Sequence, residues 1–254
     1  MKYAVKKEFT DEELIQRVTD VMEIRNVMGR HAYYHAKGLH ERELKEIWVQ
    51  KPENQKTASF GQNWGYNVGM ERIDAYYGKG SVENYQKDLE ELHAADPSVE
   101  VTKENLGIGS LVIHMLTAPY IEVAADGKTA QGLWYSIGQR TEPNGDGTAS
   151  AHWVCGKIGA DFMKEDGVWK IWRLTEAPDI IVTPGEAVAD QPVFWEKGAN
   201  LMENLFGSPT VPMTAHDPTY NWSDSFPPAP EPYYTYADEM GNCPQGVHNE
   251  WRPY

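Results

Sequence analysis

Four β-rich apolar runs between residues 108 and 179 constrain the fold of this chain most strongly. They cover residues 111–123, 129–140, 151–164 and 168–175. Turn-forming residues separate the runs, and Gly127 and Gly167 permit the positive φ that tight hairpins require. Strands joined in sequence by short reversals form an antiparallel meander. Strands of this length predict a strongly bent sheet with one concave face.

The alternation of side chains along each strand leaves the identity of the concave face open. In the first run, either His114 or its immediate neighbours face inward, because successive side chains point to opposite faces. In the second run the choice is between Trp134 and Tyr135. In the third run it is between His152 and Trp153. Each pair therefore offers one candidate for a ligand-facing position.

Helices are expected to precede the sheet. Thr10 and Glu13 have the spacing of a capping box and predict a first helix that runs to about Gly38. Shorter elements are expected as helices over residues 40–49, 70–77 and 82–94 and as a strand near 57–60. The order of helices and then strands predicts an α+β fold.

The last turns of the first helix carry His31, Tyr34 and His35, which lie on neighbouring positions because residues three and four apart share a helix face. This arrangement predicts a polar and aromatic cluster. The alternative is that these residues only terminate the helix, where histidine interacts favourably with the helix dipole. The i, i+4 spacing of the two histidines also permits a metal pair, but no HExxH motif accompanies it. We therefore expect no metal.

Composition narrows the class of partner. The chain has 254 residues, is 41% hydrophobic and carries a formal charge of −15. Nucleic acids and anionic membranes require a basic face, so neither is expected as a partner. The N-terminal residues lack the apolar region of a signal peptide, and no apolar run is long enough to span a membrane. A cytoplasmic location is expected.

The segment after residue 180 differs from the rest. Residues 176–254 contain twelve of the sixteen prolines and have a net charge of −10, with 12 acidic residues against Lys197 and Arg252. We expect residues 1–180 to form the main domain and residues 181–254 to form a helix near 193–206 followed by an extended arm. Its many aromatic residues predict that the arm packs on the domain or on a neighbouring subunit.

Four segments, taken in order, resemble the SnoaL-like branch of the nuclear-transport-factor-2-like superfamily. They are IRNVMGRHAYYHAKG, GYNVGMERIDAYY, IHMLTAPYIEVAADGKTAQGLWY and DFMKEDGVWKIWRL. The resemblance covers about residues 12–180. It implies an α+β cone in which a strongly bent antiparallel sheet and N-terminal helices enclose an apolar pocket. Oligomers, as dimers or trimers, are common in this superfamily, so a homo-oligomer is expected.

The superfamily includes scytalone dehydratase, bile-acid dehydratase, ketosteroid isomerase, polyketide cyclases and γ-formaldehyde lyases of lignin-derived dimers. The resemblance implies catalysis without a cofactor. It also implies that His114, at the start of the first long strand, is catalytic. The family's aspartate on the first helix is absent, so Tyr34 or His35 would take its place. Arg173 matches a further dehydratase position on the last strand.

Elimination of a hydroxyl group requires an acid at the leaving oxygen and a base across the new double bond, and imidazole can serve either role. Tyr34 could assist the leaving group, and Arg173 could stabilise a developing oxyanion. Aromatic or polar contacts to the substrate are expected from Trp64, Tyr66, Trp134, Tyr135, His31 and His152, although plain core packing is the alternative for the tryptophans.

These observations together favour a cofactor-independent lyase that acts on a hydrophobic, hydroxylated aromatic molecule. A lignin-derived diarylpropane that loses formaldehyde or water to give a stilbene-like product fits this expectation. A steroid or polyketide dehydratase or isomerase is the alternative enzyme. A ligand-binding module without catalysis is the alternative outside enzymes, since the same fold can serve as a scaffold.

Overall fold

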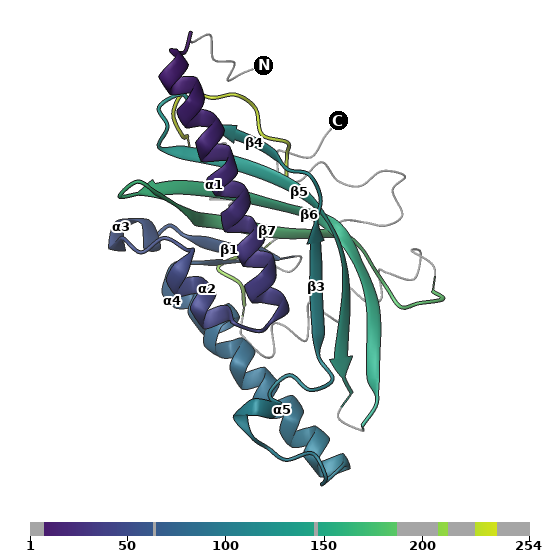
Figure 1. Ribbon diagram of the computed structural model, residues 1–254. Coiled ribbons are helices and arrows are strands. Elements are labelled where there is room, and N and C mark those ends of the chain that lie inside the picture. Colours follow the sequence, from purple (N-terminus) through teal and green to yellow (C-terminus); the bar gives the residue numbers. More distant parts are fainter. Residues whose placement is uncertain (1–7, 63–64, 145–146, 187–207, 213–226, 238–254) are drawn as a thin grey trace.

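Helix α1 (Asp11–Ala36) lies across one face of a curved sheet, as Figure 1 shows. The computed structural model describes residues 8–62, 65–144, 147–186, 208–212 and 227–237. Within these ranges the fold is α+β, with the helices N-terminal to most of the strands. The expected fold class is confirmed.

The helical elements begin close to their expected positions. The capping box that starts α1 is formed by Thr10 and Glu13, which bond each other's backbone. The shorter elements are α2 (His40–Glu46), α3 (Pro52–Gln55), α4 (Met70–Ile73), the π-helical turn η1 (Asp74–Gly78), α5 (Lys79–Ala95) and the 3-10 turn η2 (Lys103–Asn105). The expected helix over residues 193–206 lies outside the described residues.

The sheet runs in the order β3-β5-β6-β7-β1-β2-β8, with β4 paired beside β3 on β5. Its strands are β1 (Ser59–Gln62), β2 (Gly65–Val68), β3 (Leu111–Leu116), β4 (Tyr120–Val123), β5 (Thr129–Pro143), β6 (Ala149–Glu165), β7 (Val168–Val182) and β8 (Val211–Pro212). The long strands pair antiparallel, whereas β1 pairs parallel to β7. This parallel pair was not expected from the sequence.

One predicted strand is divided in the structure. The apolar run 111–123 forms β3 and β4, and both pair with β5. Pro119 lies between them and has no N–H group with which to continue a ladder. Both strands run antiparallel to β5, and across the break the register shifts by one residue, from Leu116 opposite Ser136 to Tyr120 opposite Leu133. His114 therefore lies on its own short strand.

The tight turn between β6 and β7 follows the sequence expectation. Asp166 and Gly167 have φ values of 50° and 82°, and they are the only residues between the two strands. Two consecutive positive φ angles match the right-handed twist of the flanking strands. The turn therefore fixes the register at the start of the β6–β7 hairpin.

Helix α1 is held on the sheet by apolar packing and by one buried charge. Ile24 and Met28 are buried in the main core. Asp20 is 1% exposed and accepts hydrogen bonds from Lys164 Nζ at 2.6 Å and Trp169 Nε1 at 3.0 Å. A buried carboxylate needs such partners because its desolvation is costly. The ion pair thus ties α1 to the β6–β7 hairpin.

Residues 227–237, one of the described parts of the C-terminal segment, pack near the β4–β5 turn. The N–H groups of Ala125 and Asp126 donate to the carbonyl oxygens of Tyr233 and Tyr234 at 3.0 and 3.1 Å. Tyr233 is 2% exposed, and its hydroxyl lies 3.1 Å from Thr129 Oγ1. These contacts cover the sheet where α1 begins.

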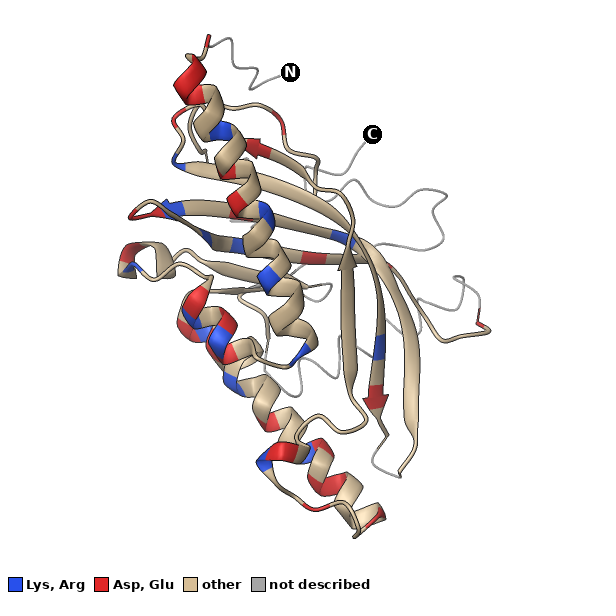
Figure 2. Cartoon of the chain, in the orientation of Figure 1, with Lys and Arg blue, Asp and Glu red and all other residues tan. Residues whose placement is uncertain are grey.

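Charge is distributed unevenly over the described elements. In Figure 2 acidic positions, mixed with basic ones, colour the ribbons of α1, α2 and α5, whereas most of the length of the strands is uncharged. No helix among the described residues is both long enough and apolar enough to cross a membrane.

We expect Gly61→Ala to destabilise the fold. A Cβ at this position would lie 2.3 Å from Cε1 of Tyr66, which is fully buried on the neighbouring strand. Overpacking of this kind costs about 1–3 kcal/mol. Chemical denaturation of the variant measures the loss in free energy of unfolding.

Gly29→Ala is the matched control. No atom lies within 4 Å of a Cβ built at Gly29, in the middle of α1, so the variant is expected to gain roughly 1 kcal/mol through helix propensity. Equal stability of the two variants would contradict the packing of Tyr66 against Gly61.

Candidate functional site

Three side chains from three distant elements converge at one place. His35 lies in the last turn of α1, His114 in β3 and Glu176 in β7. One nitrogen of each ring and one carboxylate oxygen lie within 4.8 Å of one another. The two histidine rings have centroids 5.0 Å apart. His35 and His114 are partly buried, whereas Glu176 is buried.

The orientation of His35 is fixed by a hydrogen-bond relay. The Tyr77 hydroxyl donates to Glu43 Oε2 at 2.8 Å. Its oxygen can therefore accept from His35 Nδ1, which lies 2.9 Å away. This arrangement places the proton of neutral His35 on Nδ1 and leaves the lone pair of Nε2 available.

Glu43 is the centre of this relay. It is fully buried and also accepts from His31 Nδ1 at 2.8 Å and from Trp48 Nε1 at 3.1 Å. Burial alone would raise the pKa of Glu43, but the charge of His31 and the hydrogen bonds outweigh burial and lower it. Burial opposes protonation of His31, yet its contact with Glu43 leaves its pKa raised. The pair is therefore charged inside the protein.

The two site histidines have the opposite tendency. Burial, and then the neighbouring histidines His114, His40 and His31, hold the pKa of His35 well below its ordinary value. Burial is also the main cause that lowers the pKa of His114, against the attraction of Glu176. Both rings are therefore neutral near pH 7 and can act as bases or as ligands.

Tyr77 reaches the site because of an unusual backbone segment. It lies in η1, a π-helical turn between α4 and α5. Such turns are rare and are frequent at functional sites. The ring of Tyr77 is stacked on His35, with an interplanar angle of 5° and centroids 5.8 Å apart. The turn thus supplies both the packing surface and the acceptor for His35.

Glu176 is oriented by a second chain of hydrogen bonds. Gln62 Nε2 donates to Glu176 Oε2 at 2.7 Å, and the Tyr76 hydroxyl donates to Gln62 Oε1 at 2.5 Å. On the other side of the site, His114 Nδ1 lies 3.1 Å from Ser136 Oγ. Each of the three converging groups is therefore held by a partner behind it.

The structure brings together three of the residues expected from the sequence. His35 and His114 face each other, and His31 lies behind His35 with ring centroids 5.8 Å apart. His31 is fully buried and belongs to the supporting layer.

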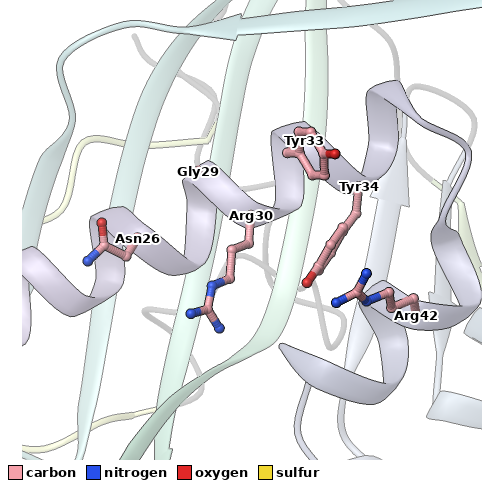
Figure 3. A pocket seen from close by; sticks show the side chains of 6 residues that line it. All are labelled: Asn26, Gly29, Arg30, Tyr33, Tyr34 and Arg42. Atoms are coloured by element: carbon pink, nitrogen blue, oxygen red, sulfur yellow. The ribbon is translucent and has the colours of Figure 1, made fainter.

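Tyr34 lies on another side of α1. Its hydroxyl donates to Glu46 Oε2 at 2.5 Å, and Arg42 lies over its ring. Tyr34 lines an open surface pocket of about 490 Å³. Figure 3 shows it there together with Arg42, Arg30, Tyr33, Asn26 and Gly29. The Tyr34 and His35 side chains have different hydrogen-bond partners, because adjacent helical residues point about 100° apart.

Arg173 lies on the opposite face of the sheet from the histidine cluster. It is three residues from Glu176 on β7, so their side chains project to opposite faces. The guanidinium is buried, stacks on Trp172 with its Cζ atom 3.9 Å from the ring centroid, and donates to the Tyr236 hydroxyl at 2.6 Å. It therefore anchors the C-terminal segment 227–237.

The aromatic positions separate into buried and exposed sets. Trp134 is 2% exposed and packs on Phe162, whereas Tyr135 is 57% exposed on the other face. His152 is buried with Nδ1 3.4 Å from Thr183 Oγ1. Tyr66 is fully buried beside Gly61. Trp64 lies outside the described residues.

Four residues of the site were not singled out from the sequence. They are His40, Glu43, Tyr77 and Glu176. The ring of His40 packs edge-on against Tyr77, with centroids 4.4 Å apart. In the sequence, Glu43 is marked only by lying four residues before the apolar pair Ile47 and Trp48, a pattern too common to indicate a buried carboxylate. The four residues come together only in the fold, because they lie in α2, in η1 and in β7.

We expect helix α1 to contain one charged histidine, His31, and one neutral histidine, His35, near pH 6.5. In ¹⁵N-edited NMR spectra, His35 should remain neutral with its proton on Nδ1 below pH 6.5, while His31 should titrate above this value. Because unfolded His35 takes up a proton that the folded form does not, its share of stability falls as pH drops below about 6.5.

The variant His35→Gln should remove part of the loss of stability between about pH 6.5 and 5. A doubly protonated His35 at pH 6.5 would contradict the relay through Tyr77.

Comparison with known proteins identifies the family. The family model described as a SnoaL-like domain matches residues 16–175. No curated protein sequence matches the chain. Similar solved structures include a protein of unknown function from Mycobacterium tuberculosis, with 14% identity, a TM-score of 0.49, and coverage of 80% of this chain and 97% of that chain.

Two further structures are similar at comparable levels. A hexachlorocyclohexane dehydrochlorinase from Novosphingobium barchaimii has 13% identity and a TM-score of 0.48, with 70% of this chain and 97% of that chain covered. A putative scytalone dehydratase from Novosphingobium aromaticivorans has 11% identity and a TM-score of 0.45, with 67% and 91% covered. The family match spans well over half of the sequence, and the chain therefore belongs to the SnoaL-like domain family.

Proposed function

We propose that this protein is a lyase that uses acid–base catalysis, without a cofactor, on a hydroxylated aromatic small molecule. The observation that carries the proposal is the relay from Glu43 through Tyr77 to His35, which leaves a neutral imidazole aimed at His114 and Glu176. A base held in one tautomer beside a second imidazole is the minimum that an elimination requires.

In the proposed reaction, His35 takes a proton from the substrate through Nε2. Glu176 stabilises the positive charge that forms on His35. His114 donates a hydrogen bond to the leaving hydroxyl, which departs as water with the proton that His35 took, so that both rings are neutral again and no net proton is consumed. The two ring centroids are 5.0 Å apart.

Loss of formaldehyde follows from the same arrangement. His35 takes the O–H proton of the hydroxymethyl group, and the neighbouring benzylic hydroxyl, hydrogen-bonded by His114, leaves as water with that proton. The C–C bond breaks, formaldehyde departs, and the electron pair forms a conjugated double bond. A diarylpropane diol has both groups in the required positions, and this is the substrate class that we propose.

The buried aromatic residues around the cluster support an aromatic substrate. Tyr77 stacks on His35, and Phe60 lies against Tyr77 with centroids 4.6 Å apart. Flat rings of this kind favour a flat apolar ligand. Arg173 and Tyr34 have no role in the proposed reaction, because both are engaged elsewhere.

Purified, EDTA-treated protein should convert a diarylpropane diol to a product with new ultraviolet conjugation, and formaldehyde should appear after derivatisation. Conjugation without formaldehyde, or turnover of hydroxysteroids instead, would identify a dehydratase or isomerase. Binding of the diarylpropane diol or the hydroxysteroids without turnover would contradict the lyase proposal and favour a binding module.

Variants test the assignment of roles. His35→Gln and His114→Gln should each reduce kcat by about 10²-fold or more. Tyr77→Phe should reduce kcat less and shift the acidic limb of the pH profile, because it keeps both imidazoles and removes the hydroxyl that orients His35 and donates to Glu43. Tyr33→Phe, at an exposed position on α1, and His93→Gln are the matched controls and should leave kcat unchanged. Full activity of both site histidine variants would overturn the mechanism.

A further inference from the structure

The converging groups His35, His114 and Glu176 also have the composition of a metal-binding site. Two imidazoles and one carboxylate are ligands that divalent transition metals use, with other positions left open. The ligand atoms come from α1, β3 and β7 and lie within 4.8 Å of one another. They therefore surround one point from three sides.

Each ligand is supported by a second layer, as metal ligands usually are. The Nδ1 atoms of His35 and His114 are engaged with Tyr77 and Ser136, so the Nε2 lone pairs are the ones left to coordinate. Oε2 of Glu176 is held by Gln62. Glu176 is only 7% exposed, and its Oε1 atom is buried without a hydrogen-bond partner among the described residues.

A buried carboxylate oxygen without a donor is costly, since desolvation is not compensated. A cation beside it would remove this cost. Arg140 and His31 oppose a cation here, as their charges act on both histidines, while Glu176 favours one.

We propose that His35, His114 and Glu176 bind one divalent transition-metal ion, with Zn²⁺ as the representative species, and that the bound ion inhibits the lyase. Tetrahedral zinc has bonds of about 2.0–2.1 Å, so it would draw the ligand atoms to roughly 3.3 Å apart. The inhibitory part of this proposal rests on the proposed function, because the ion occupies the Nε2 atoms with which His35 would take a proton and His114 would donate a hydrogen bond. The binding part does not.

Metal binding is tested without any substrate. The EDTA-treated full chain, freed of chelator, is titrated with Co²⁺, whose visible absorption reports protein ligands, and with Zn²⁺ by calorimetry. We expect one ion per chain in both titrations. Glu176→Gln and His114→Gln should weaken binding by about 100-fold or more, and Tyr77→Phe by about 10-fold, as second-layer changes do.

The matched control is His93→Gln, which removes a histidine outside the cluster and should leave the affinity unchanged. Circular dichroism verifies that each variant is folded. Absence of stoichiometric binding, or binding that all the cluster variants retain, would overturn the site.

Inhibition is measured separately, on whichever of the diarylpropane diol and hydroxysteroid substrates the protein turns over. One equivalent of Zn²⁺ should abolish turnover, and EDTA should restore it. Activity unaffected or increased by stoichiometric Zn²⁺ would overturn the inhibitory role while leaving the binding result intact. If no substrate is turned over, the lyase proposal fails and the titrations still decide the metal site.

Discussion

The buried carboxylate of Glu43 is the interaction on which the rest of the site depends. It accepts hydrogen bonds from the side chains of His31 in α1, Trp48 just after α2, and Tyr77 in η1. A buried charge is tolerated only when it is paired and hydrogen-bonded, and loss of one partner of such a pair costs about 3–5 kcal/mol. The contacts of Glu43 therefore constrain where α1, α2 and the π-helical turn meet.

Function and stability use the same contacts in this arrangement. The Tyr77 hydroxyl satisfies Glu43 by donating to it, and the lone pair that remains on its oxygen selects one tautomer of His35. Substitution of Glu43 would thus alter catalysis through orientation and also destabilise the core. Tyr77→Phe separates the two effects better, since the ring that packs between His35 and Phe60 is retained.

Local patterns in the sequence predict the elements but not the contacts between them. The capping box at Thr10 and the turn at Asp166 are determined within a few residues, so both are confirmed. The break at Pro119 and the parallel pairing of β1 with β7 depend on neighbouring strands, so neither was predicted. His114 and His35 were identified by resemblance, whereas Glu176 becomes visible only when β7 pairs alongside the other strands.

The location of Arg173 shows how the alternation of side chains along β7 separates two polar networks on opposite faces of the sheet. One network, on the face that carries Glu176, holds the histidines, and the other joins Arg173 to Tyr236 and, through the Tyr236 hydroxyl at 3.1 Å, to Asp161. A sequence position on the right strand is therefore not sufficient for a catalytic role, because a shift by one residue moves a side chain to the other face. Here the arginine contacts the segment 227–237, and the proposed chemistry is assigned to the histidine cluster on the other face.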